Sequence, residues 1–226
     1  MEWVLNNLPA IGQHTLEHIE IALPPIVLSF FLAIPLGWLS RRFGGARGAI
    51  LTTASILYAL PSLPLLVILP LIIGTDLQSP INVVIALTLY GVALMARSTY
   101  DGLKSVDPDV RQSATALGYS AWGRFVSVEF PLAGPVLLAG IRVVSVSTIS
   151  LTTVGGTLGI PGLGLLFTEG FQTGNTDEIT TGIVLTIVLA LILDRILVVI
   201  ARRLMPWTRG VSRRERRARI KKVASA

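Results

Sequence analysis

Long hydrophobic runs, separated by short polar stretches, dominate this chain of 226 residues. A helix that crosses a bilayer needs about 20 consecutive, mainly apolar residues. Five runs approach or exceed that length, and we expect each to form a membrane-spanning helix. The predicted spans are 21–39, 49–73, 81–99, 131–154 and 179–200.

The second predicted span contains three prolines, Pro61, Pro64 and Pro70. Backbone groups that proline leaves unpaired in hydrocarbon must find partners in neighbouring helices or in water. We therefore expect this span to face protein or a solute pathway rather than lipid.

Hydroxyl side chains are frequent in the outer half of the fourth predicted span. Small polar residues let membrane helices approach closely, and they also offer a solute weak, replaceable contacts. Both interpretations stay open. The candidates for a translocation pathway are Tyr58, Pro61, Ser62, Pro64, Ser147, Ser150, Thr152 and Thr153.

Basic residues are distributed asymmetrically between the loops. Cytoplasmic flanks of membrane proteins are enriched in Lys and Arg. If the N-terminus lies outside the cell, every Lys and Arg of the loops lies in the cytoplasm. The external segments then carry Asp and Glu but no Lys or Arg. This predicts an external segment 1–20, a cytoplasmic loop 101–130 and a basic cytoplasmic tail 201–226. We expect the tail to attract anionic lipid rather than nucleic acid.

The composition supports a membrane protein and excludes several kinds of chemistry. Hydrophobic residues make up 52% of the chain and charged residues 14%, with a mean hydropathy of +0.70, whereas soluble domains are about 25% charged. Cysteine is absent, which excludes disulfides, thiolate metal sites and thiol nucleophiles. We expect one all-α integral membrane domain with no catalytic residues and no cofactor of its own.

The polar loop between the third and fourth spans has signals for two short helices. Asp107 followed by Pro108 is typical of a helix start, Gly118 of a helix end, and Ser120 of a second helix cap. Such a pair forms a knob that fits a groove of another protein. An ordinary solvated loop is the alternative.

This loop resembles the EAA loop of type I ATP-binding-cassette importer permeases, whose pattern is Glu-Ala-Ala, three residues, Gly, nine residues, Ile, one residue, Leu-Pro. The glycine and the proline keep the family spacing here, whereas Gln-Ser replaces the leading Glu-Ala. The resemblance implies a MetI-like fold of about five spans whose two-helix cytoplasmic loop docks on an ATPase. It assigns ATPase coupling to Gln112, Ser113, Ala114, Gly118, Tyr119, Trp122, Phe125 and Pro131.

Four further segments, 59–65, 97–104, 138–142 and 159–164, are similar to permeases for glycine betaine, carnitine and choline. The resemblance implies a type 1 transmembrane domain over 21–200 in the inner membrane of a bacterium. It implies that the solute is a quaternary-ammonium osmoprotectant, which includes proline betaine. It also implies three partners, namely an external solute-binding protein, an ATPase that binds ATP and Mg²⁺, and a second permease that is identical or homologous. A permease for another small solute, such as an amino acid, and a stand-alone secondary carrier are the alternatives.

Glycines are concentrated between the fourth and fifth spans. The segment is not preceded by a strand, so a phosphate-binding loop is not expected. We interpret it as a hinge before a short outer helix near 165–171, and as a gate or a binding-protein contact. The hinge residues are Gly155, Gly156, Gly159, Gly162 and Gly164.

Two further patterns involve ionisable residues. Arg142 and Asp194 lie about 16 Å and about 12 Å from the cytoplasmic ends of their spans at 1.5 Å per residue. We hypothesise an ion pair between them, although Arg195 is a rival partner. The pattern His14-Thr-Leu-Glu-His18 matches that of inverted zinc peptidases. We expect an interfacial helix there and no metal site.

Overall fold

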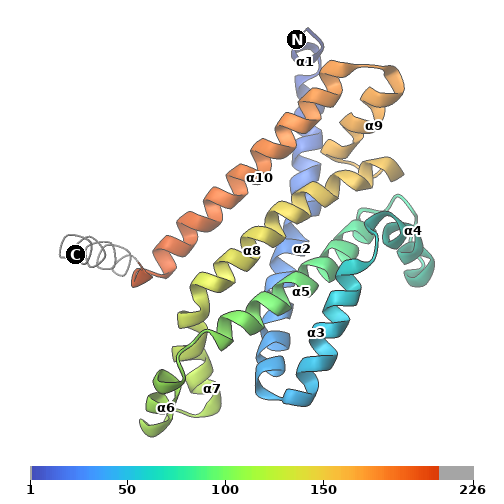
Figure 1. The fold of residues 1–226 in the computed structure, drawn as a ribbon. Coiled ribbons are helices and arrows are strands. Elements are labelled where there is room, and N and C mark those ends of the chain that lie inside the picture. The colour runs from blue at the N-terminus through green and yellow to red at the C-terminus, as the bar shows by residue number, and fades with distance from the viewer. Residues whose placement is uncertain (1, 209–226) are drawn as a thin grey trace, which may run out of the picture.

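The computed structural model describes residues 2–208, and every regular element in that range is a helix (Figure 1). In chain order the elements are α1 (Glu2–Asn6), α2 (Leu8–Arg42), α3 (Gly44–Ala59), α4 (Ser62–Ile73), α5 (Pro80–Lys104), α6 (Pro108–Ala116), α7 (Ala121–Arg124), the π-helical turn η1 (Phe125–Glu129), α8 (Phe130–Thr152), the 3₁₀ segment η2 (Thr153–Leu158), α9 (Leu163–Thr173) and α10 (Thr176–Leu204). The basic tail beyond residue 208 lies outside the described residues.

The helix α5 is the centre of the bundle and packs against α2, α3, α4 and α8. Its side chains Leu87, Met95 and Leu103 are fully buried. Close packing depends on glycine facing a small hydroxyl residue, because a Cβ atom at Gly91 would lie 2.6 Å from the Cβ of Ser29 on α2. Helices in lipid associate through such small residues, since no hydrophobic driving force brings them together.

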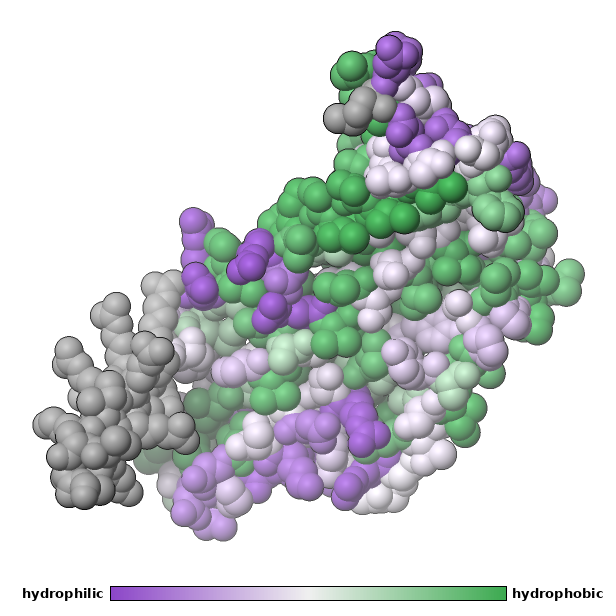
Figure 2. All heavy atoms as spheres, turned by 45° about the horizontal axis from the view of Figure 1, so that its top comes forward, coloured by the Kyte–Doolittle hydropathy of each residue, from purple (hydrophilic) through white to green (hydrophobic). Residues whose placement is uncertain are grey.

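The helix α10 lies at the edge of the bundle, where it packs against α8 and α9. The most apolar window of α10 is 6% buried, whereas the corresponding windows of the other three long spans are 33–50% buried. Figure 2 shows a band of hydrophobic residues over this helix, with hydrophilic residues at the top and along the bottom of the view and one further group beside the band. This distribution fits a protein that crosses a bilayer.

The second predicted span, 49–73, corresponds to two helices with a break between them. Its two halves, α3 and α4, are bent by 105° relative to each other. The bend falls at Leu60, which precedes Pro61 and has an extended backbone with ψ 135°, because proline disfavours the helical conformation of the residue before it. The Tyr90 hydroxyl of α5 donates a hydrogen bond of 2.7 Å to the carbonyl of Leu60. The partner that the broken backbone requires in a membrane is thus supplied by α5.

The helix α2 is longer than the first predicted span, because it begins at Leu8 and ends at Arg42. At 1.5 Å per residue its 35 residues exceed the roughly 30 Å of a bilayer core. The opposite end of α2 is tied to α5, since Arg41 Nε donates to the Leu103 carbonyl at 3.1 Å. Arg47 of α3 also lies 4.8 Å from the ring centre of Tyr100 on α5.

Candidate functional site

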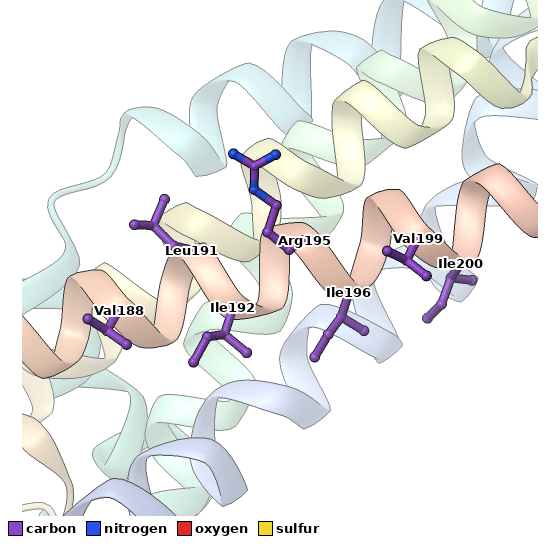
Figure 3. Close-up of a pocket in the computed structure, with 7 residues that line it drawn as sticks. All are labelled: Val188, Leu191, Ile192, Arg195, Ile196, Val199 and Ile200. Atoms are coloured by element: carbon purple, nitrogen blue, oxygen red, sulfur yellow. The ribbon is translucent and has the colours of Figure 1, made fainter. Parts of the chain in front are cut away.

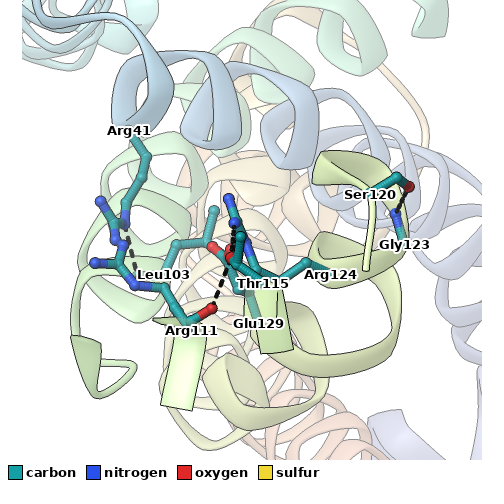
Figure 4. Close-up of polar contacts among 8 residues, drawn as sticks. All are labelled: Arg41, Leu103, Arg111, Thr115, Ser120, Gly123, Arg124 and Glu129. Atoms are coloured by element: carbon teal, nitrogen blue, oxygen red, sulfur yellow. Dashed lines mark hydrogen bonds and ion pairs between the residues drawn. The ribbon is translucent and has the colours of Figure 1, made fainter. Parts of the chain in front are cut away.

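The knob, residues 107–124, contains the two short helices α6 and α7 at one end of the bundle (Figure 1). Asp107 caps α6, because its side chain accepts a hydrogen bond of 2.8 Å from the backbone of Asp109. Ser120 caps α7 in the same way, through Gly123 at 3.1 Å (Figure 4). Between the helices the chain turns at Gly118, whose φ of +85° favours glycine.

The tip of the knob presents apolar side chains to its surroundings. Leu117 is 79% exposed, Trp122 65% and Tyr119 44%. Gln112 and Ser113 of α6 are also exposed. An exposed cluster of large apolar and aromatic residues on an otherwise polar loop is typical of a protein-binding surface.

Three other residues that were assigned to ATPase coupling, Ala114, Phe125 and Pro131, are not exposed on this tip. Ala114 and Phe125 are buried, and Pro131 is partly buried in the first turn of α8. Phe125 is surrounded by aromatic rings, with centroid distances of 5.5 Å to Trp122, 5.9 Å to Trp38 and 5.9 Å to Phe130. These side chains shape and anchor the knob rather than offer it to a partner.

A polar contact that the sequence analysis did not identify ties the knob together (Figure 4). Arg124 at the end of α7 donates from Nε to Glu129 Oε1 and from Nη1 to Thr115 Oγ1, each at 2.7 Å. Glu129 is 6% exposed. The spacing of five residues between Arg124 and Glu129 is not that of an α-helical pair, so sequence periodicity gives no signal for it.

The structure brings Arg142 and Asp194 together across α8 and α10. Arg142 Nε and Nη2 donate to the two carboxylate oxygens of Asp194, at 2.5 and 3.0 Å. The side chain of Asp194 is 13% exposed and that of Arg142 is 45% exposed. Ionisable residues within spans usually face protein or water and find partners there. This bidentate ion pair connects α10 to α8.

The pathway candidates come from two parts of the bundle, the α3–α4 bend and the end of α8 with η2. Tyr58, near the α3–α4 bend, packs edge-on against Tyr90 of α5 at 6.3 Å, and Figure 1 shows α5 between α3 and α8. On α8, Ser150 is exposed whereas Thr152 is buried and donates to the carbonyl of Thr148. Thr153 likewise donates to the carbonyl of Ser150. The assignment of these residues to a pathway stays a prediction.

The glycine-rich segment is a tightly packed turn between η2 and α9. Gly155 and Gly156 are buried, and a Cβ atom at Gly156 would overlap with the backbone of Gly164. Gly159 and Gly162 have φ values of +76° and +129°. These glycines therefore permit a close backbone crossing, and the role of gate or hinge stays a prediction.

His14 and His18 have different environments. His14 Nδ1 lies 3.1 Å from Glu17 Oε2. His18 is fully buried, with Nε2 3.1 Å from the carbonyl of Ile149 on α8. A Cβ atom at Gly162 would lie 3.3 Å from His18 Nδ1. His18 thus lies in the bundle interior, and the expectation of an interfacial helix at this segment stays a prediction.

Within residues 2–208, no group of three or more His, Asp or Glu side chains is arranged to hold a metal ion. The hydrophobic groove on α10 also lacks the features of a solute site (Figure 3). It is lined by seven residues of that one helix, and Arg195 is its one charged member. Such a face suits lipid or another membrane helix.

The fold and the knob define a membrane-spanning transport subunit. The chain belongs to the family of binding-protein-dependent transport system inner membrane components, whose model matches residues 22–208. The expected resemblance to this class of permease is therefore confirmed, and so is the all-α fold with four to five apolar spans.

Similar proteins support the same assignment. The glycine betaine/carnitine/choline transport system permease OpuCB of Bacillus subtilis is 32% identical over 206 residues, which cover 91% of this chain and 94% of that protein. The ergothioneine transport permease/ergothioneine binding protein EgtU of Helicobacter pylori is 33% identical over 74% of this chain and 31% of that protein. A chain of the MetNI methionine ABC transporter has the same fold, with a TM-score of 0.80, 19% identity and coverage of 88% and 98%.

Proposed function

We propose that this chain is the permease subunit of an ATP-driven importer for a quaternary-ammonium osmoprotectant such as glycine betaine, carnitine or choline. The observation that carries the proposal is the knob, whose exposed apolar tip is connected to the spans by buried contacts. A permease that hydrolyses no ATP itself needs such a surface in order to receive movement from an ATPase. The solute class is supported by OpuCB, which is similar over nearly the whole chain.

Three partners follow from this proposal. A cytoplasmic ATPase binds the knob and supplies the site for ATP and Mg²⁺, while an external binding protein delivers the solute, in line with the family description and with the binding-protein part in the name of EgtU. A second permease subunit, identical or homologous, completes the pathway. The exposed hydrophobic face of α10 suits lipid or that subunit.

The same proposal fixes the orientation in the inner membrane of a bacterium. The knob must lie in the cytoplasm, and Arg41 and Lys104 flank it at the same end of the bundle. The end with α9 and the start of α10 then lies outside, where Asp177 and Glu178 occupy the first turn of α10. This agrees with the enrichment of basic residues on cytoplasmic flanks.

Reconstitution into proteoliposomes tests the function. The chain is inserted with its ATPase and its binding protein, and uptake of radiolabelled glycine betaine, carnitine, choline, ergothioneine and methionine is measured. We expect uptake of a quaternary-ammonium solute that requires both partners and ATP. Uptake by this chain alone under an ion gradient would show a secondary carrier, and ATP-driven uptake restricted to methionine would refute the solute class.

A further inference from the structure

The connection between the knob and the spans is a π-helical turn. The chain is helical without interruption from Ala121 to Leu158, and within this stretch the residues of η1 form π-helical turns. Short π-helical segments are rare and are frequently found at functional sites. The turn lies where any movement of the knob must enter α8.

One side chain spans this turn. Arg124 precedes η1 and Glu129 ends it, so their 2.7 Å contact bridges η1 from end to end. The same guanidinium contacts Thr115 on α6, also at 2.7 Å. Arg124 therefore connects α6, α7 and the start of α8. Lysine has a single ammonium group without the planar fork of arginine, and it does not reproduce both contacts in this geometry.

The burial of Glu129 makes this contact more than a surface ion pair. The side chain of Glu129 is 8% exposed and that of Arg124 is 28% exposed. A buried carboxylate that loses its partner is strongly unfavourable, whereas exposed pairs contribute little. The turn is therefore held in one geometry as long as the pair is intact, and Phe125, packed against Trp122 and Phe130, holds it further.

We propose that Arg124 and Glu129 are positioning residues that make the knob and α8 move as one rigid body. We call this ion pair, together with its contact to Thr115 on α6, the clasp. The inference rests on the proposed function, in which the knob binds an ATPase. In that setting the clasp transmits the displacement of the knob to α8, and without it the π-helical turn bends and absorbs the displacement.

The first test uses the permease alone. The sequence has no cysteine, so Leu117→Cys and Val146→Cys give one specific pair of spin labels, on the knob and on α8, where both side chains are exposed. We expect one narrow distance distribution, which Glu129→Gln and Arg124→Lys each broaden. The label pair Leu132→Cys and Val146→Cys lies within α8 and serves as the control that stays narrow. An unchanged knob-to-α8 distribution in both variants would overturn the proposal.

The second test uses the complete transporter. We expect Glu129→Gln to co-purify with the ATPase as the wild type does, while the solute transported per ATP hydrolysed falls about fivefold or more. Asp101→Asn, which removes an exposed carboxylate from α5, is the matched control and should keep the ratio. Thr115→Val leaves the buried pair intact and should give a smaller fall in the solute transported per ATP hydrolysed. This variant keeps the test decisive if Glu129→Gln folds poorly.

Two outcomes contradict the inference. An unchanged ratio in Glu129→Gln and Thr115→Val would show that the clasp does not transmit movement. Loss of ATPase co-purification in a variant that inserts normally would place Arg124 and Glu129 in the docking surface instead. If the wild-type chain binds no ATPase at all, the proposed function fails, and the spin-label measurement on the isolated permease still decides whether the clasp holds the turn.

Discussion

Gly37 of α2 faces Thr99 of α5 so closely that a Cβ atom at position 37 would lie 2.5 Å from the Thr99 Cβ. Thr99 is fully buried, and its hydroxyl donates to the carbonyl of Met95 in its own helix. The threonine therefore has little freedom to move away. The separation of α2 and α5 is set by the absence of a side chain at Gly37.

The first prediction concerns this contact. Gly37→Ala should destabilise the bundle by about 1–3 kcal/mol, because an added methyl group in a closely packed interface forces backbone shifts. Thermal unfolding of the purified protein in detergent measures the effect. Gly12→Ala on the same helix is the control, since a Cβ there meets nothing within 4 Å. Equal unfolding midpoints for the two variants would contradict the packing argument.

The second prediction concerns the turn of the knob. Gly118 has a φ of +85° and open space around it, so within the permease a substitution there acts through backbone conformation. Left-handed conformation costs most L-residues about 1–2 kcal/mol, and asparagine tolerates it best. ATPase co-purification should therefore weaken in the order Gly, Asn, Ala, Val. Gly48→Ala in α3 adds a methyl group into open space without a positive φ and should have no effect. Full co-purification of Gly118→Val would disprove a fixed turn at this position.

The third prediction concerns the ion pair between α8 and α10. Asp194→Asn and Arg142→Gln should each lower the thermal midpoint, because either change leaves one charged or polar partner without its two-pronged contact. The exchange Arg142→Asp with Asp194→Arg should recover part of the loss. Arg195→Gln, on the exposed face of α10, should have a smaller effect. A double exchange that is no better than its single changes would argue that the pair is not the link between these helices.

The fourth prediction concerns the break between α3 and α4. Tyr90→Phe removes the hydroxyl that donates to the Leu60 carbonyl at 2.7 Å. A hydrogen bond of this kind contributes about 0.5–1.5 kcal/mol, and hydrogen exchange should accelerate at Leu57 to Leu65. Tyr58→Phe removes a hydroxyl from the neighbouring ring and is the control. Unchanged exchange in Tyr90→Phe would show that ring packing, which phenylalanine keeps, holds the bend without the hydrogen bond.

Much of the local structure could be predicted from the sequence. The capping residues Asp107 and Ser120, with the turn at Gly118, indicate two short helices because caps and turns act within four residues of the chain. The opposite charges and similar depths of Arg142 and Asp194 indicate partners on different helices, and the structure pairs them.

Other features depend on neighbours far apart in the chain, and sequence periodicity does not reveal them. The break at Pro61 is visible in the sequence, but its angle of 105° and the contact of Leu60 with Tyr90 are not. His18 carries a local zinc-like pattern, yet its partner is the carbonyl of Ile149. The clasp between Arg124 and Glu129 depends on a π-helical turn. The two residues are five positions apart, whereas side chains that meet on an α-helix are three or four positions apart.

The sequence by itself determined that this protein resides in a membrane and which segments are apolar enough to cross it, because transfer of a segment into lipid depends on its own composition. It also determined the EAA-like loop. The tertiary structure decided which side chains of that loop are exposed, as Trp122 is, and which are buried, as Phe125 is. It also decided how closely the helices approach one another. The exposure of side chains and the approach of helices both depend on packing between residues that are distant in the chain.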